Sequence, residues 1–361
     1  MISFNINDVP TLFIKAFTAR DVQTIIDFVR DAGSSTTSTG NVVLFIDNPI
    51  TTHTVEAVEK LLAEGYRVCY RDHHGIDGEP ANDRDRQVKA AANKLAQDLG
   101  GDCRITVRRL HPACSTLVKV GEFQDAVAII ADPDADGLTA AMKAAGIFYS
   151  QLDEDAALLD GEPHLQVTGS AISQLLAKGM ATLPSFDAKD PTKREQAQQA
   201  LFADWVRAVQ DDKQAENRLS EVVVAYDQAV KVAEKLAACA VEVVPGVMMA
   251  DCLEQPVFDP GTLIHLLEHR PGCRITILKK GLGPIAAVHG VQYSLAVAKI
   301  YQSEINLQKI LPSDTRSGPQ FGVITNVSFL LHVSEDVFLE TVLGQLRGLS
   351  QSWLQAGQAN T

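Results

Sequence analysis

The chain has 361 residues, of which 46% are hydrophobic and 21% are charged, as in an ordinary globular protein with a sizeable core. Its net charge of −13 disfavours binding to long nucleic acids, because the overall field repels their phosphates. No apolar run reaches about 18 residues and the N-terminus MISFNINDVPTLF lacks a basic flank, so neither a membrane span nor a secretory signal is predicted.

The first half of the chain alternates apolar runs with amphipathic segments. Strands are predicted at 10–17, 41–47, 66–75, 103–110 and 126–137. Helices are predicted at 21–33, 51–65, 82–99, 114–123 and 138–146. The run NVVLFID is too apolar for a strand with one exposed face, which favours a central parallel strand. The repeated strand–helix unit predicts an α/β fold with a doubly wound parallel sheet.

The second half begins with helices and ends in a smaller α/β pattern. Residues 150–180 and 191–238 are predicted to be mainly helical. Strands are predicted at 241–251, 273–281 and 321–333, with helices at 261–269 and from residue 335. The predicted organisation is an α/β domain at 1–185, a helical connector at 186–240 and a second, smaller α/β domain at 241–361.

The cysteines are scattered and form no CxxC pair, and four of them lie in or beside apolar runs. This pattern favours reduced core residues in a cytoplasmic protein over a disulfide framework or a zinc site. The six are Cys69, Cys103, Cys114, Cys239, Cys252 and Cys273.

Acids and histidines follow three of the apolar strands. They are Asp47, then Asp72, His73 and His74, then Asp132, Asp134 and Asp136. Ligands of an open parallel sheet bind beyond the carboxyl ends of its strands, so these side chains are expected to converge there. Crowded carboxylates require a neutralising cation, and oxygen ligands with imidazole suit Mn²⁺ or Mg²⁺. The pattern therefore predicts a site for two divalent cations, with an aspartate between them.

Each motif also has a simpler interpretation. Asp47 could cap the following helix, and the Asp-His-His triplet could be a polar turn. The stretch DPDADG resembles the start of an EF-hand loop, but position twelve of that loop would be Lys143, which cannot ligate calcium. The conjunction of three acidic strand ends is what favours the metal site.

The triplet at Asp72 and the stretch DPDADG together resemble the DHH phosphoesterases. That family includes RecJ-type exonucleases, nanoRNases, phosphoadenosine phosphatases, cyclic-dinucleotide phosphodiesterases and polyphosphatases. The resemblance covers residues 40–180 well and the C-terminal domain loosely. It implies a DHH domain paired with a smaller C-terminal domain and two metal ions, Mn²⁺ or Mg²⁺, in each chain.

The resemblance also implies residue roles. Asp47 would bridge both ions, and His73, Asp134, Asp136 and Asp160 would be metal ligands, although Asp160 could instead begin a loop. Asp72 would orient His73, His74 would face the substrate phosphate, and Asp132 would lie close by as a further catalytic residue. In the family the paired-aspartate motif precedes the Asp-His-His triplet, whereas here it follows it, so a rearranged motif order is predicted.

The family's GGGH-like signature is absent, and KKGLGPIAAVHG is the nearest segment. Cations and backbone amides for a phosphate are expected in two polar loops of the C-terminal domain, where either loop could also be a solvated turn. The candidate substrate-binding residues are Lys279, Lys280, Gly281, Gly283, His289 and Arg316.

The predicted function is a metal-dependent phosphoesterase that hydrolyses a small phosphate ester or anhydride, or a short oligonucleotide, by a metal-bridging hydroxide. The alternatives are a RecJ-like single-strand exonuclease and a degenerate, non-catalytic nucleotide-binding or scaffold member of the fold. The aromatic content of 6% disfavours a long base-stacking groove. Neither a long duplex nucleic acid nor a membrane is expected as a partner. The sequence is compatible with a homodimer but does not decide the oligomeric state.

Overall fold

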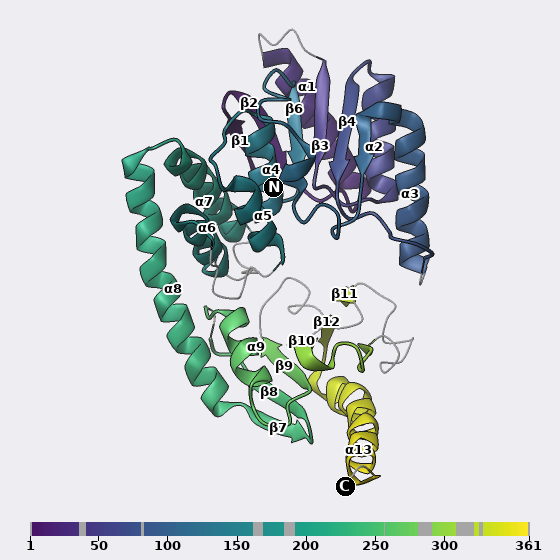
Figure 1. Cartoon of the computed structure of the whole chain (residues 1–361), viewed down its shortest axis with the longest axis vertical. Coiled ribbons are helices and arrows are strands. Elements are labelled where there is room, and N and C mark those ends of the chain that lie inside the picture. Colours follow the sequence, from purple (N-terminus) through teal and green to yellow (C-terminus); the bar gives the residue numbers. More distant parts are fainter. Residues whose placement is uncertain are drawn as a thin grey trace. The chain divides into compact units, whose positions relative to one another are not determined.

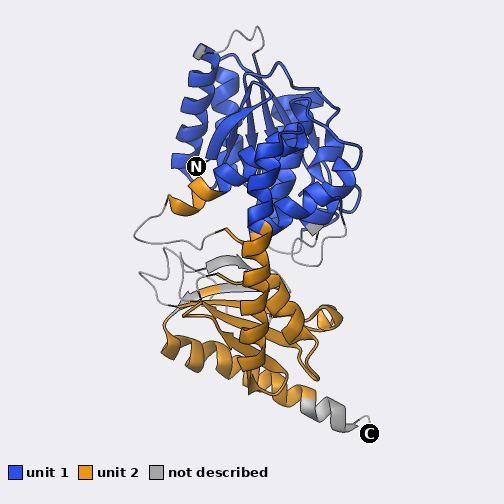
Figure 2. Cartoon of the chain, turned by 90° about the vertical axis from the view of Figure 1, so that its left-hand side faces the viewer, with its two compact units in different colours: residues 1–180, 198–222 blue, residues 181–197, 223–361 orange. Residues whose placement is uncertain are grey.

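The structure is a computed structural model that describes residues 2–35, 41–80, 83–161, 169–183, 192–255, 257–280, 291–307, 321–324 and 328–359. The chain divides into two units, which Figure 2 colours separately. Unit 1 comprises Met1–Met180 and Gln198–Val222, and unit 2 comprises Ala181–Ala197 and Val223–Thr361. The division between Val222 and Val223 falls inside helix α8 (Lys213–Cys239). Each unit contains its own six-stranded sheet.

The sheet of unit 1 has the strand order β1-β2-β6-β3-β4-β5, and Figure 1 labels all of these strands except β5. Its strands are β1 (Ile2–Ile6), β2 (Val9–Phe13), β3 (Val42–Ile46), β4 (Arg67–Asp72), β5 (Cys103–Ile105) and β6 (Ala128–Ala131). The neighbouring strands β2, β6, β3, β4 and β5 all pair in parallel, and β1 pairs with β2 in an antiparallel hairpin. The predicted parallel α/β sheet is thus confirmed.

The N-terminal hairpin was not expected from the hydrophobic pattern. Its two-residue loop is Asn7-Asp8, and both residues have positive φ, 48° and 65°. Positive φ at both loop residues is the requirement of a type I′ hairpin turn, for which Asn and Asp are favoured residues. The Asn7-Asp8 turn is therefore the feature of the sequence that indicates the hairpin. The strand before it, ISFNI, is too short and too mixed in polarity to be predicted from its hydrophobic pattern.

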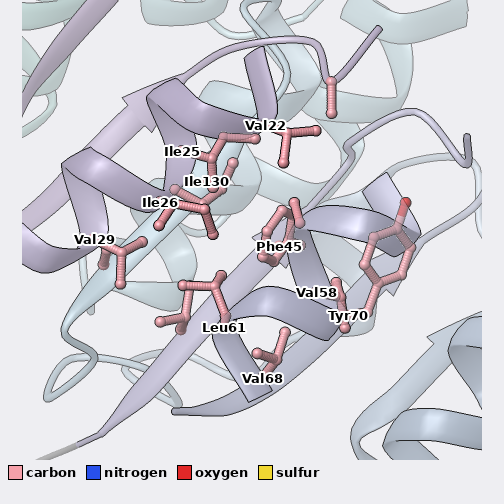
Figure 3. Close-up of a cluster of buried hydrophobic side chains, with 14 of the residues drawn as sticks. Val22, Ile25, Ile26, Val29, Phe45, Val58, Leu61, Val68, Tyr70 and Ile130 are labelled. Atoms are coloured by element: carbon pink, nitrogen blue, oxygen red, sulfur yellow. The ribbon is translucent and has the colours of Figure 1, made fainter. Parts of the chain in front are cut away.

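Helices cover both faces of this sheet. One face packs on α1 (Ala19–Ser35), α2 (Thr52–Ala63) and α3 (Asp83–Leu99). Figure 3 shows part of that core, where Ile25 and Leu61 lie with Phe45, Tyr70 and Ile130. Side chains alternate along a strand, so the neighbouring, fully buried Leu44 belongs to the opposite face. The doubly wound arrangement is therefore confirmed.

The opposite face is where the chain places α4 (Ala135–Ala144), every residue of which is buried. Helix α4 packs on β3 and β6, and it is covered by α5 (Leu152–Gly161) and a 3₁₀ turn, η2 (Cys114–Leu117). Residues 114–123 were predicted as a short helix, but only this turn is helical. Further helices in this part of the chain are α6 (Ala171–Ala181) and α7 (Lys193–Val209).

Unit 2 has a second six-stranded sheet, in the order β11-β12-β10-β9-β8-β7. Only β8 and β9 pair in parallel among its described strands. The strands are β7 (Val241–Val244), β8 (Val247–Asp251), β9 (Ile275–Lys280), β10 (Val291–Val297), β11 (Phe321–Ile324) and β12 (Ser328–Val333).

Two clusters of buried side chains belong to the sheet of unit 2. One joins it to α13 (Leu343–Ala359) and the preceding π-helical turn at Phe338–Val342, and the other to α8 and α9 (Pro260–Glu268). The predicted second α/β unit is therefore confirmed.

Several predicted strands have different limits in the structure. Residues 241–251 were predicted as one strand but form two, β7 and β8, because the chain turns at Gly246 with φ 82°. The strand predicted at 103–110 ends at Ile105, and 321–333 divides into β11 and β12. No described helix combines the length and apolar character needed to cross a membrane.

The six cysteines are free thiols. Cys69, Cys114, Cys252 and Cys273 are buried, whereas Cys239 is exposed. Cys239 therefore differs from the expected core position, because it is exposed at the C-terminal end of α8.

Candidate metal centre

The strand register brings the predicted acids together in unit 1. Ile46 at the end of β3 pairs with Ala131 of β6 on one side and with Arg71 of β4 on the other. The residues that follow are Asp47, Asp132 and Asp72, so three carboxylates stand side by side at the carboxyl edge of three adjacent parallel strands. This placement depends on β6, which lies between β2 and β3 although it is the last of the six strands of this sheet in the sequence.

Asp47 occupies the centre of this edge. Its side chain is 1% exposed, and its backbone adopts φ 54°, a left-handed conformation uncommon for a residue with a side chain. The backbone N–H of Asp47 donates to the carbonyl of Arg71. The cap of α2 is Thr51, whose hydroxyl accepts from the N–H of Thr54. The helix-cap interpretation of Asp47 is therefore wrong.

His73 is fully buried and points one ring nitrogen at the acids. Nδ1 lies 2.7 Å from the carbonyl oxygen of His111, and because a carbonyl only accepts, Nδ1 carries the proton. The lone pair is then on Nε2, which lies 3.7 Å from Asp47 Oδ1, 3.4 Å from Asp136 Oδ2 and 3.6 Å from Asp160 Oδ2. Burial lowers the pKa of His73 to about 4, so the ring is neutral near pH 7.

Asp72 contacts His74 and not the ring of His73, which corrects the role implied by the family resemblance. Asp72 Oδ1 accepts from the backbone N–H of His74 and lies 3.4 Å from His74 Nδ1. His73 is oriented by the backbone carbonyl of His111 instead. Burial lowers the pKa of His74, but the hydrogen bond and charge of Asp72 outweigh it and raise the pKa overall. His74 is half-exposed, with Nδ1 3.4 Å from Asp47 Oδ1.

The aspartates of the DPDADG stretch straddle the start of α4. Asp134 caps the helix, because its Oδ1 accepts from the N–H of Gly137 at 2.9 Å. Asp136 lies in the first turn, and both of its carboxylate oxygens accept from the N–H of Cys114, at 3.2 and 3.0 Å. Asp132 pairs with Lys15 through Oδ2, at 2.9 Å. The helix N-terminus favours negative charge here.

Asp160 also lies at this centre. It is in α5, and its Oδ1 accepts a hydrogen bond from Arg108 Nη2 at 2.5 Å. Its second oxygen, Oδ2, faces His73. The structure thus places Asp160 beside the other predicted ligands and not in a separate loop.

Several buried atoms of this cluster have no hydrogen-bond partner among the described residues. They are Oδ2 of Asp47, Asp72 and Asp160, Oδ1 of Asp132 and Nε2 of His73. Buried polar atoms in proteins are nearly always partnered, so this concentration of unpartnered acceptors calls for a ligand that only accepts electron pairs. A cation is such a ligand.

The electrostatics of the cluster agree with this requirement. Burial, and then the charges of Asp134 and Asp136, raise the pKa of Asp47 well above its ordinary value. Burial also raises the pKa of Asp136, against the opposing hydrogen bond from Cys114. Burial and Asp134 raise the pKa of Asp132 to about 7, although Lys15 opposes them. A bound cation would remove the cost of ionising these carboxyls.

The donor atoms form three overlapping groups, within each of which they lie no more than 4.8 Å apart. One group is Asp47, His73, Cys114 and Asp136, another is Asp47, Asp132 and Asp134, and the third is Asp47, Asp72 and His74. Asp47 is common to all three. The residues present therefore fit divalent cations, and they fit more than one position that shares Asp47.

Three residues of this region were not identified from the sequence. The thiol of Cys114 lies 3.3 Å from Asp47 Oδ1, and Lys15 and Arg108 each pair with one of the acids. Cys114 was interpreted as a core residue because nothing in a single cysteine marks it as a ligand. Lys15 follows β2, which pairs with β6, the strand before Asp132. Knowledge of the strand order would therefore have indicated that Lys15 lies near Asp132.

Two of the predicted substrate-binding residues lie in the described part of unit 2. Lys279, in β9, is buried and pairs with Glu335 at 2.7 Å and Asp251 at 3.6 Å. Lys280 follows it and lies 6.0 Å from the ring centre of Phe258, and burial lowers its pKa. Gly281, Gly283, His289 and Arg316 lie outside the described residues.

Comparisons with known proteins find similarity among solved structures. No protein-family model matches the sequence, and neither does any curated protein. Among solved structures, the pGpG-specific phosphodiesterase PggH from Vibrio cholerae is similar at 12% sequence identity, over 86% of this chain and 99% of that one, with a TM-score of 0.40.

Proposed function

We propose that the chain is a metal-dependent phosphoesterase that hydrolyses a small phosphate ester or anhydride, or a short oligonucleotide. The observation that carries the proposal is the buried set of unpartnered donor atoms around Asp47 at the carboxyl edge of the sheet. Asp47 would be shared by two divalent cations. His73, Asp136 and Asp160 would hold one, and Asp132 and Asp134 the other. Divalent cations at such a site lower the pKa of water and neutralise the charge of a reacting phosphoryl group.

Three further side chains beside the metal centre, those of His74, Arg108 and Lys15, would contact the substrate. His74 and Arg108 are both half-exposed, and His74 Nε2 lies 3.3 Å from Arg108 Nη2. Arg108 has no acceptor, so its Nη2 donates to His74 Nε2, and its remaining N–H groups can donate to a phosphoryl oxygen beside His74. Lys15, beside Asp132, is a further half-exposed cation at the same edge. Lys280, Arg316 and the other predicted residues of unit 2 stay proposals for substrate contact.

Hydrolysis of a substrate panel tests the function. The chelator-stripped chain, reloaded with Mn²⁺, should hydrolyse at least one of a bis-p-nitrophenyl ester, linear di- to pentanucleotides, 3′-phosphoadenosine phosphate, cyclic dinucleotides and polyphosphate, and the stripped chain should not. Because few phosphates are engaged, the Michaelis constant should change less than about tenfold between low and physiological salt.

Two results would contradict this function. A twenty-nucleotide strand preferred over a dinucleotide, with a salt slope that grows by roughly 0.7 for each phosphate contact, would favour the RecJ-like exonuclease. Binding of cations and nucleotides without hydrolysis of any substrate would instead favour a non-catalytic nucleotide-binding protein.

Arg108 offers a separate test of substrate contact. Arg108→Ala should raise the Michaelis constant about 10-fold or more, the scale of a lost hydrogen bond to a charged group, while bound metal stays unchanged. The neighbouring Arg109 is a matched control, since it is more exposed and pairs with Asp77 away from the cluster. Arg109→Ala should behave as wild type. Equal effects of the two substitutions, or a loss of metal in Arg108→Ala alone, would reject Arg108 as a substrate contact.

A further inference from the structure

Cys114 differs in its surroundings from two other buried cysteines, Cys252 and Cys273. Cys252 and Cys273 direct their thiols at backbone carbonyls within an apolar cluster of unit 2. The thiol of Cys114 is also fully buried, but it lies 3.3 Å from a carboxylate oxygen of Asp47. Its sulfur is within 4.8 Å of donor atoms of Asp47, His73 and Asp136. Two unpartnered buried atoms, His73 Nε2 and Asp47 Oδ2, belong to the same group.

The fold fixes Cys114 at this place through its backbone. The residue begins the 3₁₀ turn η2, and its N–H donates to both oxygens of Asp136. The next residue, Ser115, is anchored as well, because its hydroxyl donates to Asp153 at 2.7 Å and its carbonyl accepts from Lys143 at 3.0 Å. The sulfur is therefore held against the acids by a rigid, buried turn rather than by a mobile loop.

The donor groups that share Asp47 differ in chemistry. The group with Asp132 and Asp134 offers only carboxylate oxygens, which suit hard cations such as Mg²⁺ and Mn²⁺. The group with His73 and Cys114 adds an imidazole nitrogen and a sulfur, which suit borderline cations such as Zn²⁺, Fe²⁺ and Co²⁺. One shared aspartate thus joins two positions of unlike preference.

We propose that Cys114 is a metal ligand and that the centre holds two chemically different cations, a borderline transition metal beside His73 and Cys114 and a hard cation beside Asp132 and Asp134. This inference rests on the metal centre of the proposed function and specifies the kind of cation at each of its two positions. When the borderline cation binds, the thiol proton passes to solvent and the thiolate ligates the cation. The sulfur then selects the metal at one position only.

Cobalt titration of the chelator-stripped full chain tests the proposal without an activity assay. Co²⁺ should produce a near-ultraviolet thiolate-to-cobalt charge-transfer band that saturates at one ion per chain. In Cys114→Ser that band should disappear while the visible cobalt bands persist, and the affinity for Zn²⁺ should fall at least about tenfold. Cys239→Ser, at an exposed thiol, is the matched control and should keep the band. Elemental analysis after loading with Zn²⁺ and Mn²⁺ together should find one of each.

The outcomes separate this inference from the proposed function. Cobalt that binds wild-type protein without a thiolate band would overturn the role of Cys114 and leave the metal centre intact. A chain that binds neither Co²⁺ nor Mn²⁺ would overturn both. The wild-type spectrum alone decides between these results, so the test does not depend on the folding of the Cys114→Ser variant.

Discussion

Asp47→Asn is expected to lose at least one bound cation and to lower turnover by about 100-fold or more, the scale reached when one electrostatic stabiliser of a transition state is removed. Asn has the shape of Asp but no charge, and Asp47 is the residue that all three donor groups share. Without metal the same substitution should raise the melting temperature, because burial and the neighbouring acids already disfavour the ionised form of Asp47. Loss of function would therefore accompany a gain in stability of the metal-free chain.

Metal content, turnover and thermal unfolding of the same preparations measure this prediction. The matched control is Asp155→Asn, since Asp155 is another buried aspartate of unit 1. Its carboxylate is satisfied by Ser170 and Tyr149, outside the metal centre. Asp155→Asn should keep both cations. An Asp47→Asn variant that binds two cations and turns over normally would show that Asp47 is not a shared ligand.

Gly137→Ala is expected to destabilise the chain by about 1–3 kcal/mol or somewhat more, the usual range for overpacking, and to reduce metal binding. A Cβ atom at Gly137 would lie 2.3 Å from the carbonyl oxygen and 3.0 Å from the nitrogen of Asp132. Both are backbone atoms, so neither can move aside without displacing the strand end. The shift would misplace Asp132 and the cap that Asp134 forms with the N–H of residue 137.

Chemical denaturation and cation titration together check the effect of Gly137→Ala. Gly101→Ala is the matched control, because Gly101 also lies in unit 1 and a Cβ there meets no atom within 4 Å. The control should unfold at nearly the wild-type denaturant concentration and bind cations normally. If Gly137→Ala is as stable as Gly101→Ala, the close approach at Asp132 is not a constraint on the centre.

The sequence by itself determined the fold class and the main acids of the centre. Apolar runs such as 42–46 and 128–131 are typical of buried strands, and their alternation with amphipathic helices predicts a parallel sheet. Every residue that directly follows a parallel strand lies at one edge of the sheet. This is why Asp47 and Asp132 could be placed there without knowing which strands are neighbours.

Only the tertiary structure decided which side chains meet. The order β2-β6-β3-β4 sets Asp132 against Asp47, and a pattern of hydrophobicity contains no information on strand order. The ring of His73 donates to the backbone carbonyl of His111. Because every residue has a backbone carbonyl, the sequence cannot indicate which one this partner is. Cys114 and Arg108 reach the centre from the segment between β5 and β6, where the structure has only the 3₁₀ turn η2 in place of the predicted strand to residue 110 and the predicted helix at 114–123. Their roles depend on long-range packing, because the free energy that places them comes from contacts between segments distant in the sequence.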